Sequence, residues 1–161
     1  MPVVIQMTVS FTGHRDADSP AVRERLRETV EELINDGADI FCAGGAIGFD
    51  TIAAETVLEL QDEYPWIMLA LILPCSPEEQ TAKFSPDMKR RYFDILNAAD
   101  RRETVSPYYT SDCMKRRNQR LVDLADVCLC FYDENKHFSS GTGQTVRMAE
   151  KKGIPIINIF E

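Results

Sequence analysis

The sequence predicts an α/β fold in which a mostly parallel β-sheet carries helices on both faces. Short apolar runs alternate with helical patterns along the chain, an order typical of strand–helix–strand units. The run from Ile67 to Leu73 is apolar at every position, as expected for a strand covered on both faces. With 161 residues, the chain is expected to form one domain over residues 1–161.

Each element of this pattern has a local signal. Ser19 and Pro20 supply an N-cap and a first helical residue, and Gly37 supplies a left-handed end to that helix after residue 35. Gly153 ends the last helix in the same way. The other expected helices are 47–61, 87–99, 112–124 and 144–152, and the expected strands are 7–11, 38–43, 67–73, 103–105, 127–132 and 154–160. Right-handed crossovers between such strands give a Rossmann-like three-layer α/β/α sandwich.

The charge of the chain bears on its partners. The formal net charge is -8 and the pI is about 4.8. An acidic protein repels a phosphate backbone at long range, which argues against nucleic acid as a partner. A small anion is still compatible with this charge, because a pocket can be locally positive.

The cysteines and apolar runs bear on compartment and metal. The five cysteines are an odd number with no signal peptide before them, so we expect reduced thiols in a cytoplasmic protein. Cys128 and Cys130 point to one strand face, and no second pair or nearby histidine accompanies them, so no metal site is expected. No apolar run approaches the ~20 residues that span a bilayer, so no membrane partner is expected.

Two glycine-rich segments follow strands and precede helices. They are Gly44-Gly45-Ala46-Ile47-Gly48 and Gly141-Thr142-Gly143. Glycine lets the backbone approach a ligand closely, and a helix start presents N–H groups and partial positive charge, which suit phosphate. The simpler alternative is a pair of tight turns without ligand. Because the carboxyl ends of parallel strands share one sheet edge, we expect both loops to form one pocket for a phosphate-bearing ligand.

Further polar residues are expected at the same edge. Gly13 relieves the turn after the first strand, Arg15 can pair with phosphate, and His14 can hydrogen-bond a base or sugar. Arg117 and Asn118 fall on or beside the apolar stripe of their helix, where polar groups need partners, and are interpreted as the pocket floor.

Asp50 has two readings from the sequence. It lies in the first turn of the helix after the first glycine loop, where a carboxylate stabilises the helix dipole. It can equally accept hydrogen bonds from ribose hydroxyls.

Taken in order, these motifs resemble the SLOG superfamily, and within it the YpsA-like group of bacterial proteins. The resemblance rests on Thr-Gly-His-Arg, Gly-Gly-Ala-Ile-Gly-Phe-Asp, Arg-Arg-Asn and Gly-Thr-Gly-Gln-Thr, and it runs from Met7 to Ile159. It implies a Rossmann-like fold and a ligand that is a nucleotide or derived from one, such as ADP-ribose or an NAD-like molecule. The positions that match are Gly13, His14, Arg15, Gly44, Gly45, Gly48, Asp50, Arg117, Asn118, Gly141, Thr142 and Gly143.

The chain departs from one enzymatic branch of that superfamily. The "lonely guy" branch, which releases the base from nucleoside monophosphates, carries Gly-Gly-x-Gly-Thr-x-x-Glu with a catalytic glutamate. This chain has Ser140, Gln144 and Arg147 at the first glycine, the threonine and the glutamate. A cation in place of the acid removes that acid–base option. The DNA-processing branch binds single-stranded DNA, which the acidic balance of this chain argues against.

Three functions remain open from the sequence. The leading one is a binder or sensor of a nucleotide-class ligand. The second is an enzyme acting on an N-glycosidic or phosphate bond, with Asp50, Glu55 or Asp133 as acid or base. The third is an interaction module with a vestigial pocket. The sequence does not decide whether the chain forms a homo-oligomer.

Overall fold

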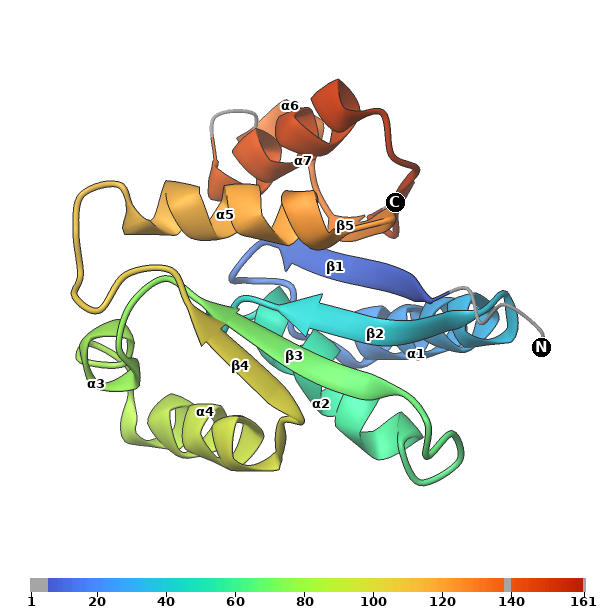
Figure 1. The fold of residues 1–161 in the computed structure, drawn as a ribbon, viewed down its shortest axis with the longest axis horizontal. Coiled ribbons are helices and arrows are strands. Elements are labelled where there is room, and N and C mark those ends of the chain that lie inside the picture. Colours follow the sequence, from blue (N-terminus) through green and yellow to red (C-terminus); the bar gives the residue numbers. More distant parts are fainter. Residues whose placement is uncertain (1–5, 138–139, 161) are drawn as a thin grey trace.

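A six-stranded sheet lies between two helical layers in the computed structural model, which describes residues 6–137 and 140–160 (Figure 1). All five strand pairs are parallel, and the strand order is β4-β3-β2-β1-β5-β6. The Rossmann-like architecture expected from the sequence is therefore confirmed. Within the described ranges, no helix is both long and apolar enough to cross a membrane.

The elements follow the predicted alternation. The strands are β1 Met7–Gly13, β2 Ala38–Ala43, β3 Met68–Leu73, β4 Arg101–Thr104, β5 Val127–Phe131 and β6 Ile156–Asn158. The helices are α1 Pro20–Asn35, α2 Phe49–Leu60, α3 Pro77–Gln80, α4 Pro86–Ala98, α5 Cys113–Leu124, α6 Glu134–His137 and α7 Gly141–Lys152.

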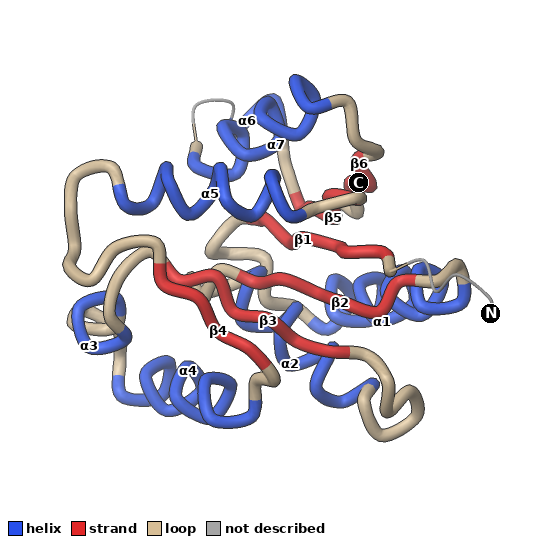
Figure 2. The backbone as a smooth tube through the Cα atoms, in the orientation of Figure 1, coloured by secondary structure: helices blue, strands red, loops and turns tan. Residues whose placement is uncertain are grey.

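The two helical layers cover different parts of the sheet (Figure 2). Helices α1, α2 and α4 lie on one face, and α5 and α7 pack together on the other, above β1 and β5. The main core joins the sheet to the first layer through fully buried side chains such as Phe11, Phe41 and Phe49. Phe11 of β1 stacks on Phe41 of β2 with ring centroids 5.9 Å apart, so the side chains of these neighbouring strands pack together in the core.

Helices α5 and α7 of the second layer are joined at their carboxyl-terminal ends. The Lys152 ammonium, in the last turn of α7, donates hydrogen bonds of 2.9 Å to each of three carbonyl oxygens at the end of α5, those of Val122, Asp123 and Ala125. The last carbonyls of a helix lack intrahelical donors, and a cation there also offsets the dipole. This single side chain therefore caps α5 and joins it to α7.

One expected loop is part of a helix. Gly141-Thr142-Gly143 forms the first turn of α7, not a connection before residue 144. The reason is the cap: Ser140 is extended, and its hydroxyl accepts from the Gly143 N–H at 3.1 Å. This cap outweighs the low helix propensity of the two glycines, so the segment presents a helix N-terminus directly.

Other boundaries also differ from the sequence expectation. The short helices α3 and α6 lie in stretches expected to be polar loops, and α3 is capped by Ser76, whose hydroxyl accepts from the Glu79 N–H. Helix α2 begins at Phe49, two residues later than expected, because Gly48 has a φ of 85° that no helix contains. Strands β4 and β6 at the sheet edges are shorter or shifted, since they carry fewer pairing constraints.

The strand order reverses beside β1. This strand pairs with β2 on one side and β5 on the other, so the crossovers diverge from it in opposite directions. In parallel sheets, ligands bind beyond the carboxyl ends of the strands at such a point. The fold thus places the segments after β1, β2 and β5 where a ligand is expected.

Gly48 fixes the contact between the segments after β1 and β2. A Cβ atom added at Gly48 would lie 2.3 Å from the carbonyl oxygen of Arg15, and its φ is already in the left-handed region. Gly153 has a similar φ of 82° but nothing within 4 Å of an added Cβ. A substitution at Gly153 therefore measures the cost of the left-handed backbone alone, and one at Gly48 adds the cost of the steric clash.

We expect Gly48→Ala to lower the free energy of unfolding more than Gly153→Ala. The strain of a left-handed alanine costs about 1–2 kcal/mol at either site, and the backbone clash at Gly48 adds about 1–3 kcal/mol. Urea unfolding of both variants measures the difference. Equal losses would show that Gly48 does not pack against Arg15.

Candidate functional site

A pocket of about 590 Å³ opens at the carboxyl edge of the sheet, and we call it the main pocket. Four segments build it: the end of β1 with the residues after it, the residues between β2 and α2 with the start of α2, the inner face of α5, and the start of α7. Its lining consists of Phe11, Thr12, Gly13, His14, Arg15, Asp16, Ala46, Ile47, Asp50, Met114, Arg117, Asn118, Leu121, Ser140, Gly141 and Thr142.

Most of the residues predicted for a shared pocket lie in this lining. The eight that do are Gly13, His14, Arg15, Asp50, Arg117, Asn118, Gly141 and Thr142. The structure therefore brings together predicted residues that lie far apart in the sequence, from Gly13 to Thr142. The four other predicted residues, Gly44, Gly45, Gly48 and Gly143, are not among the lining residues.

Gly44 lies between two buried charged side chains. A Cβ atom at this position would be 2.4 Å from Nη1 of Arg117 and 3.0 Å from Oδ2 of Asp50. Arg117 also donates from Nη1 to the carbonyl oxygen of Gly44. Glycine is required here because the Arg117 and Asp50 side chains occupy the space that a Cβ atom would fill.

Arg117 and Asp50 are the charged floor of the main pocket. Arg117 is 5% exposed and Asp50 is 7% exposed. Arg117 donates from Nε to Oδ1 of Asn118 at 3.0 Å, and Asp50 accepts from the Ala46 N–H at 3.2 Å. This arrangement agrees with the interpretation of Arg117 and Asn118 as the pocket floor, and it gives Asp50 a role in shaping the loop before α2.

Burial favours the neutral form of both groups and shifts the pKa of each accordingly. Loss of water raises the pKa of Asp50 to about 6, against the attraction of Arg117 and the backbone N–H groups of Ala46 and Gly44. Burial likewise lowers the pKa of Arg117, against the attraction of Asp50. The two charges stabilise each other in a site from which most water is excluded.

His14 has a fixed orientation in the wall of the main pocket. It is buried, and its Nε2 accepts a hydrogen bond of 2.9 Å from the backbone N–H of Asp133. Its carbonyl oxygen accepts from Phe49 N–H and Ala17 N–H, which joins the segment after β1 to α2. An accepting Nε2 places the ring proton of neutral His14 on Nδ1. The imidazole thus bridges the segments after β1 and β5.

Arg15 and the first turn of α7 supply the positive potential at the mouth. Arg15 is exposed and lines the pocket with its neighbours. The helix start contributes Ser140, Gly141 and Thr142, whose end of the helix carries partial positive charge. An added Cβ at Gly141 would meet nothing nearer than Nδ2 of Asn118 at 3.9 Å, so this end of the helix faces open space.

Several residues that line or support the pocket are not among those predicted. Met114 and Ser140 line the pocket but carry only general signals, those of an apolar stripe and a helix cap. Gln80 supports the floor by donating to the Gly44 carbonyl oxygen at 3.1 Å and accepting from the Tyr92 hydroxyl at 2.8 Å. No local pattern marks Gln80, because its role depends on where α3 sits.

Two of the three candidate catalytic carboxylates lie elsewhere. Glu55 forms ion pairs with Arg91 and Arg23 at the surface, the first at 2.5 Å. Asp133 accepts from the Asn135 N–H at 3.1 Å and does not line the main pocket. Only Asp50 lines it. Among residues 6–137 and 140–160, no group of three His, Cys, Asp or Glu side chains is placed to hold a metal ion.

The electrostatic attraction between Arg117 and Asp50 predicts a pH-dependent stability loss. We expect Arg117→Met to lower the free energy of unfolding by about 3–5 kcal/mol near pH 8, because a buried carboxylate loses its cation. The folded-state pKa of Asp50 is about 6, above its ordinary value of 3.8. The contribution of Asp50 to the free energy of unfolding is therefore fully present below pH 3.8 and is lost as the pH rises through about 6. Without Arg117 the decline continues to higher pH.

The loss in Arg117→Met should therefore be smaller near pH 5 than near pH 8. Urea unfolding at both pH values measures it. In an Asp50→Asn background the same substitution should cost less and show no such pH dependence. A loss that is equal at both pH values in the native background would contradict the pairing.

Comparison with known proteins supports the family and the fold. A family model named YpsA, described as the YspA SLOG family, matches residues 6–160. A UPF0398 protein of Halalkalibacterium halodurans is 31% identical over 77% of this chain and 66% of its own length. One of Bacillus thuringiensis is 31% identical over 82% of this chain and 71% of its own length. The chain thus spans about two thirds of the length of these relatives.

Two solved structures with the same fold are DNA processing proteins. DNA processing protein A from Helicobacter pylori has a TM-score of 0.66 and 22% identity, covering 93% of this chain and 63% of that one. Its counterpart from Streptococcus pneumoniae has a TM-score of 0.67 and 17% identity, covering 93% and 49%. These structures show the shared fold, and the family-model match over residues 6–160 shows that the chain belongs to the YspA SLOG family.

Proposed function

We propose that this protein binds a nucleotide or nucleotide derivative in the main pocket and acts as a binder or sensor of that ligand. The observation that carries the proposal is the convergence of Arg15, the N-terminus of α7 and a buried polar floor around one pocket at the sheet reversal. Its volume of about 590 Å³ lies in the range of small-molecule sites.

The electrostatics of the mouth favour a phosphate group. The chain has a net charge of -8, yet the Arg15 guanidinium and the adjacent helix end bring positive charge to this mouth. Backbone N–H groups at a helix start suit phosphate oxygens, and the Arg15 guanidinium can pair with them through two nitrogens. Asp16 also lines this mouth, so we expect the anion on the side formed by Arg15 and the first turn of α7.

The rest of the lining fits a sugar and a ring. Ile47, Met114 and Leu121 provide apolar contact surface, and Asn118 and Thr142 provide polar groups within the same pocket. Small-molecule sites combine mostly apolar walls with a few placed polar groups in this way. We further propose that the protein works in the cytoplasm, supported by five free cysteines, all buried, which suit a reducing compartment.

Binding should be visible as stabilisation. A nucleoside phosphate present at 100 times its dissociation constant should raise the free energy of unfolding by about 2.7 kcal/mol. Thermal-shift scans with AMP, ADP, ADP-ribose and NAD⁺ measure this, followed by calorimetric titration of the ligands that stabilise. No stabilisation by any of the four would remove the basis of the proposal.

Two variants test where the phosphate lies. Gly141→Asp places a carboxylate in the first turn of α7, where it suits the helix but repels an anion, and it should abolish measurable binding. Arg15→Gln should weaken binding about tenfold through loss of a charge-assisted hydrogen bond. Lys151→Gln, exposed at the opposite end of α7, is the matched control and should leave affinity unchanged. Equal effects of all three would show that the phosphate is not held at this end of the helix.

A hydrolytic or transfer reaction is a second candidate, favoured by the Asp50 carboxyl alone. Its pKa of about 6 suits proton transfer near neutral pH, and it lines the main pocket. Chromatography of nucleotides incubated with the protein detects base or phosphate release. Release that is lost in Asp50→Asn, a variant confirmed to be folded, would assign the reaction to this carboxyl.

Binding of a single nucleic acid strand is a third candidate. DNA processing protein A from Helicobacter pylori, which shares the fold, binds single-stranded DNA. On this chain the exposed Tyr108 and Tyr109 near the same sheet edge suit base stacking, whereas the net charge of -8 opposes strand binding. Retention of labelled oligothymidylate at low and moderate salt, compared with that of AMP, separates the two ligands.

A further inference from the structure

A second hollow of about 670 Å³ adjoins the main pocket, and we call it the side groove. Arg15, Ala46, Ile47 and Met114 line both hollows, so the two meet along this shared rim. The outer wall of the side groove comes from α3, the residues joining α3 to α4, the first turn of α4 and the segment before α5. The residues found only in the side groove are Glu79, Gln80, Ala82, Lys83, Phe84, Ser85, Met88 and Tyr109.

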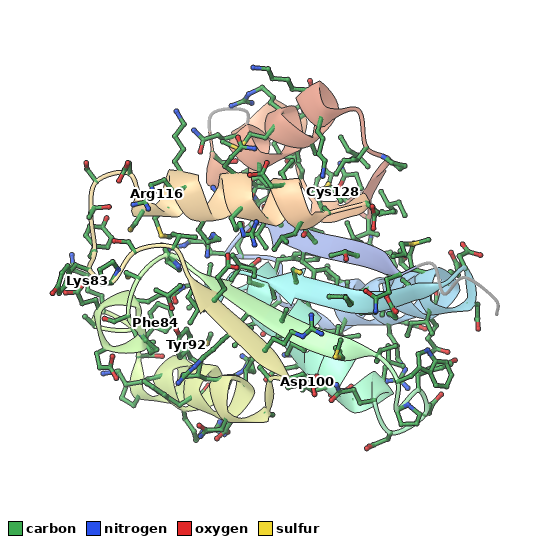
Figure 3. The ribbon with its side chains drawn as sticks, viewed as in Figure 1. Lys83, Phe84, Tyr92, Asp100, Arg116 and Cys128 are labelled. Carbon is green, nitrogen blue, oxygen red and sulfur yellow. The ribbon has the colours of Figure 1, made fainter. Side chains whose placement is uncertain are left out.

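The lining of the side groove is rich in aromatic and thioether side chains. Phe84 is held in place by an edge-on contact with Tyr92, with ring centroids 5.9 Å apart (Figure 3). Tyr109 and Met114 are 63% and 40% exposed, although both are large apolar side chains. Exposed apolar groups gathered around a hollow mark a binding surface, and flat rings stack well on such groups.

The charges of the side groove are balanced. Lys83 is exposed on one wall, and Glu79 lies on the same side, where its carboxylate accepts from the Tyr109 N–H. The amide of Gln80 is already committed to Gly44 and Tyr92. A neutral ring therefore suits the side groove better than a second phosphate, whereas Arg15 on the shared rim suits the anionic link between two parts of one ligand.

We propose that the ligand is two-ended, with one nucleoside in the main pocket, a second ring system in the side groove and a phosphate bridge at Arg15. This rests on the proposed nucleotide binding and narrows its class to dinucleotides. The inference rests on the fact that the two hollows adjoin. Each alone has the size of a small-molecule site, so a mononucleotide would leave one of them empty.

Affinities of one-ring and two-ring probes test this inference by calorimetry. NAD⁺ and diadenosine diphosphate should bind at least tenfold more tightly than AMP. Tyr109→Ala removes an exposed ring, and Ala82→Trp fills the groove from an exposed position, so both leave the core intact. Each should weaken the two-ring probes by about five- to a hundredfold, the fold-change that corresponds to one stacked base, and leave AMP within about twofold.

Matched variants distinguish the side groove from the main pocket. Tyr108→Ala removes a neighbouring exposed ring that does not line the side groove and should change no affinity. Gly141→Asp should weaken AMP and the two-ring probes alike. Circular dichroism and urea unfolding confirm that each variant is folded before its affinity is compared.

Each other outcome overturns the inference in a recognisable way. If AMP binds and the two-ring probes bind no more tightly, or the groove variants have no effect, the two-ended ligand is wrong and nucleotide binding stands. If the groove variants weaken AMP equally, the groove holds the base of a mononucleotide. If no nucleotide binds, the proposed function fails as well; if only oligothymidylate binds and the groove variants weaken it, the groove serves a nucleic acid strand.

Discussion

The arrangement of the site depends on the space that Gly44 leaves for Arg117 and Asp50. The guanidinium reaches the Gly44 carbonyl oxygen from α5, and the carboxylate reaches the same glycine from α2. These two helices lie on opposite faces of the sheet, so their charged side chains meet over its carboxyl edge. A side chain at position 44 would separate them and leave two uncompensated charges in a buried place. Because position 44 has no Cβ atom, charged side chains from both helical layers can meet in the floor of the pocket.

Much of the fold and the site follows from local sequence signals. Apolar runs bounded by Ser–Pro caps and by Gly37 and Gly153 place most elements within two or three residues, because capping and burial act over a few positions. The rule that ligands bind past parallel strands then brings His14, Arg117 and Thr142 to one pocket without knowledge of their contacts.

The remaining features depend on tertiary contacts that sequence patterns do not encode. Gly44 and Gly48 are predicted to approach a ligand, and the structure adds contacts that no local pattern marks, with Arg117 and with the Arg15 backbone. The start of α7 was placed too late because the Ser140 cap outweighs glycine propensity. The side groove was not anticipated at all, since its wall requires α3 and Tyr109 to meet across 30 positions through Glu79.

The hydrogen bonds of Lys152 to the end of α5 connect the two helices that line the main pocket. Helix α7 offers its first turn to the pocket and fastens its last turn to the end of α5 through three carbonyl oxygens. Helix α5 carries Arg117 and Met114 on its pocket side. The two helices therefore line the main pocket at one end of the pair and are joined by Lys152 at the other. Lys152 thus spans from the helix whose first turn lines the pocket to the end of the helix that carries the buried Arg117, so loss of this one side chain would leave three carbonyl oxygens without their donor and release both helices from each other at that end.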